Sequence, residues 1–185
     1  MTAQFVLQPR PAELQGLANE YWEQSGNRER ELEKQAFDAG AAIRNGEYTL
    51  ANLEAIVRWK SERLVNYLIG NGNAMIRRAL EVAAHPESST YQAMCALLEL
   101  RGVDVRIASA ILEAIFPERY IELDVEDLVA LGQARQDVQF YEQYLAFCRG
   151  LAEKGVVAPQ PDLPGPAPLH ALDRALMQWA RNRGD

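Results

Sequence analysis

Apolar residues recur three and four positions apart along almost the whole chain, which is the spacing of an amphipathic helix. No segment combines the two-residue alternation of a strand with the turn dipeptides of a hairpin. The pattern therefore predicts an all-α protein of about ten helices, forming a single domain over residues 1–185 that could be divided into two lobes. The expected helices span residues 11–24, 28–44, 50–59, 62–69, 74–84, 90–100, 105–116, 125–131, 137–154 and 169–182.

Local signals mark where these helices begin and where the helical pattern stops. A side-chain oxygen just before a helix can accept a hydrogen bond from an unpaired backbone N–H group of the first turn. Residues 157–168 instead contain five prolines and one glycine, which predicts an extended strap that carries the last helix back to the body. The expected N-caps are Thr49, Ser61, Asn73, Ser89, Asp104 and Asp124.

Length and composition restrict the class of protein. A chain of 185 residues with 48% apolar content can bury one full core. No apolar run approaches the roughly eighteen residues that span a bilayer, and the N-terminus lacks a signal pattern, so a cytoplasmic location without membrane contact is expected. The two cysteines, Cys95 and Cys148, lie in apolar helical patterns typical of buried free thiols. His85 and His170 have no ligand partner at helical spacing, so no metal site is expected.

The balance of charge argues against a general nucleic-acid binder. Twenty-six acidic residues against nineteen basic ones give a net charge of −7, whereas such proteins usually carry a basic face. A local excess of bases nevertheless surrounds Trp59 at a break between two expected helices. These bases either converge into a groove for an anion or nucleic acid, or are scattered over the surface and paired with acids. The bases in question are Arg58, Lys60, Arg63, Arg77, Arg78, Arg101 and Arg106.

The most specific motif lies in residues 97–124. One helix ends at the tight turn Arg101-Gly102-Val103-Asp104, a second apolar helix follows, and Asp124 stands at the entrance to a third. Gly102 permits a backbone conformation without Cβ obstruction, and the first N–H groups of the second helix can hold a phosphate. A C-cap glycine followed by an N-cap aspartate, as between many helix pairs, would give the same turn.

The spacing beyond the turn makes the motif more specific. Arg106 lies in the first turn of the second helix, and Asp124 follows eighteen positions later, after the approach Phe116-Pro117 to Leu123. Residues 93–132 thus resemble the helix-hairpin-helix DNA glycosylases typified by endonuclease III, and residues 58–63 and 172–179 are similar to an uncharacterised bacterial branch with this hairpin. The resemblance implies an orthogonal helical bundle with DNA as its partner. Contacts to DNA would come from Arg101, Gly102, Val103, Arg106, Arg58, Lys60 and Arg63.

The same resemblance implies a reaction. A glycosylase turns a nucleotide out of the stack and stabilises positive charge on the sugar as the base leaves. Asp124 matches the family's catalytic aspartate. Arg106 stands where the lyase branch has lysine, and because a guanidinium stays protonated, the implied activity is monofunctional base removal without lyase chemistry. Two cysteines cannot supply the four thiolates of an iron-sulfur cluster, so no cofactor is expected.

Acidic substitutions favour a different function. Asp104 replaces the second glycine of the family's Gly-x-Gly turn, and Glu122, Glu126 and Asp127 surround Asp124. Acids at a DNA-facing edge oppose a polyanion and raise carboxylate pKa values. The alternative is therefore a non-catalytic helix-hairpin-helix interaction module that has lost DNA binding and has an unidentified protein partner.

Overall fold

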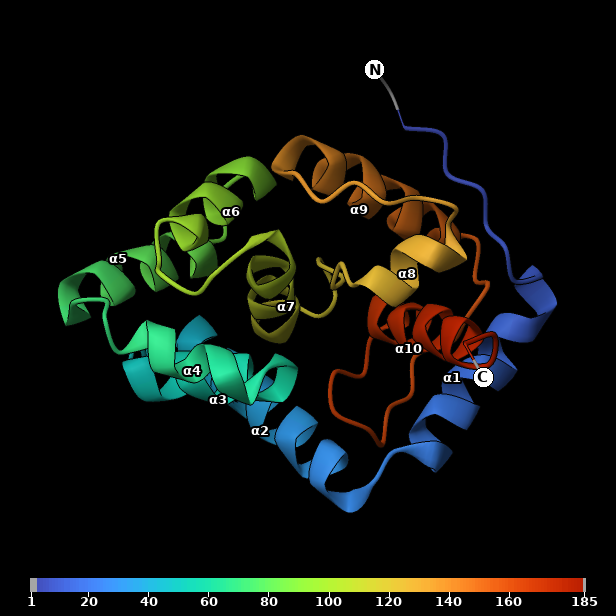
Figure 1. Ribbon diagram of the computed structural model, residues 1–185, viewed down its shortest axis with the longest axis horizontal. Coiled ribbons are helices and arrows are strands. Elements are labelled where there is room, and N and C mark those ends of the chain that lie inside the picture. Colours follow the sequence, from blue (N-terminus) through green and yellow to red (C-terminus); the bar gives the residue numbers. More distant parts are fainter. Residues whose placement is uncertain (1–2, 185) are drawn as a thin grey trace.

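The computed structural model describes residues 3–184, and all regular structure in that range is helical. This confirms the predicted all-α class and the number of helices (Figure 1). None of the described helices combines the length and apolar character needed to cross a membrane. A 3₁₀ turn, η1 (Pro11–Glu13), precedes α1 (Leu14–Gln24), α2 (Asn27–Arg44), α3 (Leu50–Lys60), α4 (Glu62–Leu68), α5 (Asn73–Ala84), α6 (Thr90–Leu98), α7 (Val105–Ile115), α8 (Val125–Ala130), α9 (Val138–Glu153) and α10 (Pro168–Arg181).

Most helices begin where their capping residues predict. Ser61 precedes α4 in extended conformation, but its side chain makes no capping hydrogen bond. The prediction for Asn73 was wrong, because Gly72 occupies the cap and Asn73 is already the first residue of α5. The caps whose side chains accept a backbone N–H as expected are Thr49, Ser89, Asp104 and Asp124.

Helix α7 occupies the centre of the molecule, with the other helices arranged around it (Figure 1). It packs against α2, α3 and α6, and every residue from Ile107 to Ile115 is buried. A helix that is apolar on all sides is a central helix of a core. Ser109 and Glu113 are the two polar residues in this stretch, so each requires a hydrogen-bonding partner inside the protein.

A glycine sets the close approach of α2 to α7. A Cβ atom added to Gly40 would lie 2.0 Å from the backbone oxygen of Ala114. Only glycine lets the two helix backbones meet at this distance. The contact places the preceding turns of α2, with the buried residues Glu33 and Phe37, beside the centre of the molecule.

Residues 154–167 form the irregular connection from α9 to α10, and Pro168, the last residue of the predicted strap, is already the first residue of α10 (Figure 1). Gly165 has a φ of +60°, and a Cβ atom there would lie 2.6 Å from the ring of Phe37. The Nη2 group of Arg174 donates a 2.9 Å hydrogen bond to the backbone oxygen of Pro164. The proline-rich connection is therefore held against α2 and α10 by packing and by a charged hydrogen bond.

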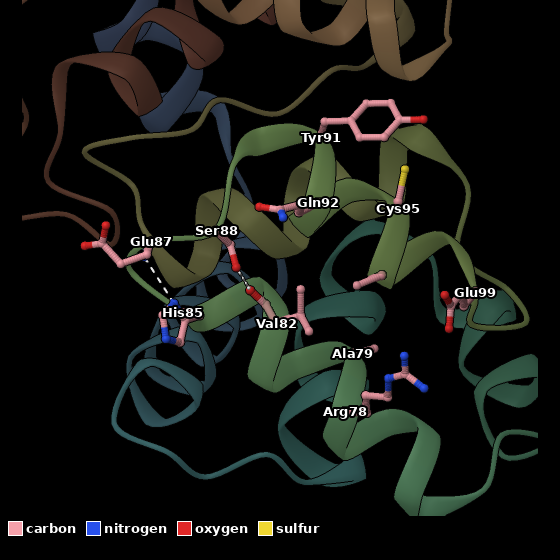
Figure 2. A pocket seen from close by; sticks show the side chains of 11 residues that line it. Arg78, Ala79, Val82, His85, Glu87, Ser88, Tyr91, Gln92, Cys95 and Glu99 are labelled. Carbon is pink, nitrogen blue, oxygen red and sulfur yellow. Dashed lines mark hydrogen bonds between the residues drawn. The ribbon is translucent and has the colours of Figure 1, made fainter.

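The two cysteines have different surroundings. Cys148 is buried, as predicted. Cys95 is only partly buried, and the prediction for it was wrong, because the side of α6 that carries it lines a groove of about 540 Å³ between α5 and α6. Figure 2 shows Cys95 in this groove below Tyr91, with Arg78 at the opposite end.

Candidate functional site

Asp124 lies at the point where an extended segment enters α8. Its Oδ1 atom accepts the N–H of Val125 at 2.7 Å, and its own N–H donates to Asp127 Oδ2 at 3.0 Å. Its side chain is 13% exposed. Asp124 is therefore the N-cap that the sequence predicts, and it still reaches the surface.

Two tyrosines from α9 hold the segment that leads to Asp124. The hydroxyl of Tyr141 donates to the backbone oxygen of Ile121 at 2.9 Å, and the hydroxyl of Tyr144 donates to that of Glu122 at 2.7 Å. Both rings are completely buried. The aromatic stripe of α9 therefore positions the backbone next to Asp124 as well as filling the core.

The polar residues of α7 hold the same segment from the other side. Glu113 Oε2 accepts the N–H of Glu122 at 3.1 Å, and Ser109 Oγ accepts the N–H of Leu123 at 2.9 Å. The Ser109 hydroxyl in turn donates to the backbone oxygen of Arg106 at 2.7 Å. Buried side chains thus fix the segment on two sides, as is required for a carboxylate that must keep one position.

Two of the predicted bases converge on Asp124. Lys60, the last residue of α3, contacts the Glu122 carboxylate, and its Nζ lies 3.5 Å from Asp124 Oδ2. The Nε atom of Arg106, in the first turn of α7, lies 3.5 Å from Asp124 Oδ1. The Lys60 side chain is 13% exposed and that of Arg106 is 37% exposed. Asp124 therefore has a cation from a different helix on each side.

These charges set the ionisation of the site. Burial opposes the charged form of Asp124, but Lys60, the Val125 N–H and Arg106 outweigh it and lower the pKa of Asp124. Burial likewise opposes the charge on Lys60, but Glu122 and Asp124 outweigh it and raise the pKa of Lys60. Both groups are therefore charged at neutral pH.

Two other carboxyl groups near Asp124 have pKa values that are shifted in the opposite direction. Burial raises the pKa of Glu122 well above its ordinary range, although Lys60 acts against the shift. Burial, and then Asp173 and Glu122, raise the pKa of Asp127 in the same way. Asp127 Oδ1 has no hydrogen-bond partner in the described part of the chain. The acids that the sequence places around Asp124 are thus mainly interior groups that favour the protonated form.

Asp124 and Lys60 line a small pocket of about 250 Å³. Lys60 Nζ lies 4.8 Å from the centre of the Trp59 ring, and the Arg181 guanidinium lies 4.7 Å from that of Tyr21. The volume is below the roughly 300–1,000 Å³ of pockets for drug-sized molecules. Its lining comes from five helices: Tyr21, Glu29, Leu32, Trp59, Lys60, Asp124, Glu126, Met177 and Arg181.

The predicted hairpin turn is formed, and α4 and the turn after it support it. Gly102 has a φ of +85°, and a Cβ atom there would lie 2.8 Å from the Cβ of Tyr67. The Asn71 side chain accepts the N–H of Arg101 at 2.9 Å and donates to its backbone oxygen at 3.1 Å. Arg101 is exposed and Val103 is buried. Among Arg101, Gly102 and Val103, Arg101 is therefore the residue that is exposed to solvent.

The N-terminus of α7 is capped by a side chain of the protein itself. Asp104 Oδ1 accepts the N–H of Ile107 at 2.9 Å. A phosphate at this helix end would have to lie beside the Asp104 carboxylate. The negative charge of Asp104 would therefore repel a phosphate at this position.

The remaining predicted bases lie away from the pocket. Arg58 is 4.0 Å from Glu54 on the same helix, and Arg63 is exposed on α4. Neither Arg58, Arg63 nor Arg101 lines the pocket at Asp124. The structure thus brings together Lys60 and Arg106, while the other predicted bases are distributed over the surface.

The sequence did not predict a polar cluster around a buried histidine, His170. His170 Nδ1 lies 2.6 Å from Glu113 Oε1, and its Nε2 lies 2.5 Å from Glu33 Oε1, which also accepts from Arg174. Burial and Arg174 oppose protonation, but the two glutamates outweigh them and raise the pKa of His170 to about 9. The sequence does contain one signal, since His170, Asp173 and Arg174 share one face of a helix.

Comparisons of the chain with protein-family models, with curated proteins and with solved structures found no match.

Proposed function

We propose that the protein binds DNA and cleaves the N-glycosyl bond of a nucleotide turned out of the strand, with Asp124 as the catalytic carboxylate. The observation that carries the proposal is an ionised aspartate that reaches a pocket of about 250 Å³. Trp59 and Tyr21 line the same pocket and offer aromatic surface to a base. The backbone before Asp124 is held by buried side chains from α7 and α9.

The chemistry requires negative charge where the sugar becomes positive. As the base departs, the Asp124 carboxylate stabilises the cationic sugar or orients the attacking water. A fixed charge in a partly buried site is more effective than one in water, because little reorganisation is needed during the reaction. Lys60 and Arg106 hold the two oxygens of Asp124 in the resting protein.

The sequence resemblance supports the same proposal. In the helix-hairpin-helix glycosylases the first-turn residue of the second hairpin helix is followed eighteen positions later by the aspartate. The corresponding residues here, Arg106 and Asp124, lie 3.5 Å apart. We therefore assign the all-α bundle to the orthogonal helix-hairpin-helix glycosylase type as part of the proposal.

The proposed reaction stops at base removal. A lyase needs an unprotonated amine to form a Schiff base with the sugar. Arg106 cannot provide one. Lys60 is a primary amine at the pocket, but its carboxylate neighbours raise its pKa and keep it protonated.

One observation favours the alternative, a non-catalytic interaction module that does not bind DNA. The Asp104 carboxylate caps the N-terminus of α7, where a hairpin of this type would receive a phosphate. The protein has a net charge of −7 and would then use its surface for a protein partner. DNA binding distinguishes the two functions.

The first experiment measures binding of fluorescent duplex and single-stranded DNA at about 50 mM and about 200 mM salt. A protein that contacts phosphates through Arg101, Arg63 and neighbouring bases binds at low salt and weakens steeply as salt rises. Absence of binding at low salt would contradict the proposal and support the interaction module.

The second experiment measures base release from duplexes that each carry one damaged base. Asp124→Asn is expected to abolish release while DNA affinity is retained. Asp137→Asn is the matched control, because Asp137 also caps a helix through a backbone N–H but lies outside the pocket. Equal rates for the wild-type protein and Asp124→Asn would eliminate the catalytic assignment.

A further inference from the structure

A second group of side chains, in the core behind the pocket, has the composition of a metal site. Helix α10 places His170 and Asp173 one turn apart, and α7 places Glu113 opposite them. One nitrogen or oxygen atom from each residue lies within 4.8 Å of the others. All three residues are buried, with at most 2% of their surface exposed.

The orientation of His170 is that of a ligand histidine. A histidine that binds a metal through one ring nitrogen usually donates its other N–H to a carboxylate, which is itself held by further polar groups. His170 Nε2 meets Glu33 Oε1 at 2.5 Å, and Arg174 Nη2 donates to the same oxygen at 2.6 Å. Nδ1 is then the coordinating atom, and it lies 2.6 Å from Glu113 Oε1 and 3.9 Å from Asp173 Oδ2.

Asp173 provides an independent indication. Asp173 is 2% exposed, and its Oδ1 atom has no hydrogen-bond partner among the described residues. Its Oδ2 atom lies 3.9 Å from His170 Nδ1. A buried carboxylate oxygen without a partner is unfavourable unless a cation or a proton compensates it.

We propose that His170 Nδ1, Glu113 and Asp173 bind a divalent cation of the zinc class inside the core. One nitrogen and two carboxylates are a donor set that zinc accepts. The site is separate from the pocket at Asp124, and the proposal does not depend on DNA binding or base removal. Because the three residues are buried, the ion enters as the chain folds and stabilises the folded state.

The geometry needs a small adjustment. Zinc lies about 2.0–2.2 Å from nitrogen and oxygen ligands, so two neighbouring ligand atoms of a tetrahedral site are separated by roughly 3.3 Å. His170 Nδ1 is 2.6 Å from Glu113 Oε1 and 3.9 Å from Asp173 Oδ2. Side-chain shifts of roughly 0.7 Å at Glu113, away from His170, and roughly 0.6 Å at Asp173, towards it, would give this separation.

A proton is the competitor for this position. With a proton on each ring nitrogen, His170 would bridge Glu33 and Glu113 as an imidazolium. In that state Asp173 lies 3.9 Å from the imidazolium, but its burial and its proximity to Glu113 disfavour its negative charge and outweigh this attraction. Asp173→Asn therefore has opposite effects in the two cases. It removes a ligand from a metal site but relieves repulsion around an imidazolium.

The experiment uses the full chain refolded with excess zinc and then freed of unbound metal by gel filtration. Zinc is measured by mass spectrometry, and the melting temperature is measured with and without a chelator. One zinc per chain is expected for the wild-type protein and for the control His85→Ala, which removes the exposed histidine. Asp173→Asn is expected to lose the stoichiometric zinc and to melt below the zinc-loaded wild-type protein. Glu33→Gln is expected to weaken zinc binding about 10–100-fold.

Two results would overturn the proposal. The first is a refolded wild-type protein without stoichiometric zinc. The second is an Asp173→Asn variant that melts at or above the zinc-treated wild-type protein, as expected for the imidazolium. Asp173→Asn is preferred to His170→Ala because it preserves side-chain volume, so loss of zinc can be measured on a folded protein.

Discussion

Lys60 and Asp124 join the end of α3 to the start of α8, with 3.5 Å between Lys60 Nζ and Asp124 Oδ2. Lys60 also contacts the buried carboxylate of Glu122. One ammonium group therefore lies beside two acids that the sequence places on the approach to α8, and it opposes the protonation of both. It also keeps Asp124 ionised where this residue meets the pocket.

Lys60→Met tests the contribution of this ammonium group to stability. We expect the free energy of unfolding to fall by about 3 kcal/mol, the lower end of the usual cost, because the ionised and largely buried Asp124 carboxylate loses the ammonium group 3.5 Å away but keeps Arg106. Urea unfolding measures the change. Lys154→Met is the control and should change stability by less than about 0.5 kcal/mol, because Lys154 is exposed.

The double variant Lys60→Met/Asp124→Asn makes the test specific. If the loss comes from an uncompensated carboxylate, neutralising Asp124 should recover part of it, because asparagine can still accept the Val125 N–H, and the two substitutions should not be additive. Additive losses would show that Lys60 contributes through the packing of its aliphatic chain rather than through its charge.

Asp127→Asn tests the raised pKa of a buried carboxyl group. Burial, Asp173 and Glu122 raise the pKa of Asp127 in the folded protein, so the protonated form is the one that folding favours. This contribution is complete below the unfolded pKa and is lost as pH rises through the folded pKa, at about 1.4 kcal/mol for each pH unit between the two pKa values. Asparagine stays neutral and can still accept the Asp124 N–H. The stability of the Asp127→Asn variant should therefore decline less than that of the wild-type protein between about pH 4 and pH 8.

Asp137→Asn provides a control of opposite sign. A backbone N–H from Phe140, and then Arg135, lower the pKa of Asp137 in the folded protein. Its contribution is therefore present above the unfolded pKa and is lost as pH falls through the folded pKa. Urea unfolding at several pH values compares the variants, and an Asp127→Asn curve parallel to that of the wild-type protein would contradict the assignment.

The sequence predicted the features that depend on local interactions. Helix periodicity gave the ten helices, and the side chains of Asp104 and Asp124 identified the starts of α7 and α8 because capping involves only the next few residues. The eighteen-residue spacing from Arg106 to Asp124 also became a contact, since one helix and a short segment connect them. These are the parts that a one-dimensional pattern can specify.

The rest of the site depends on contacts between distant segments. The sequence did not single out Lys60 from the other bases, and nothing in the local pattern of α3 indicates that it meets Asp124. The Tyr144 hydroxyl donates a hydrogen bond to the backbone oxygen of Glu122. Helical periodicity predicts only that this side of α9 is core. The sequence predicts no ligand partner for His170, because its partners Glu33 and Glu113 come from α2 and α7.

Tyr144→Phe tests whether α9 positions the backbone before Asp124. The variant keeps the ring but removes the 2.7 Å hydrogen bond to the buried backbone oxygen of Glu122. We expect a loss of about 1–3 kcal/mol in the free energy of unfolding, because that oxygen loses this partner. Tyr91→Phe, on the exposed side of α6, should be close to neutral. A neutral Tyr144→Phe would show that packing alone fixes this segment.

Gly40→Ala tests the contact between α2 and α7 that brings Glu33 beside His170. The new methyl group would lie 2.0 Å from the backbone oxygen of Ala114, so the two helix backbones must separate. Overpacking usually costs about 1–3 kcal/mol, and we expect a loss at or above the upper end because the obstacle is backbone. Gly16→Ala is the matched control. Gly16 lies in α1 with nothing within 4 Å of the added atom, so alanine should stabilise the protein by about 0.5–1 kcal/mol. Thermal and urea unfolding should therefore shift in opposite directions for the two variants, and equal stabilisation would disprove the close approach of α2 to α7.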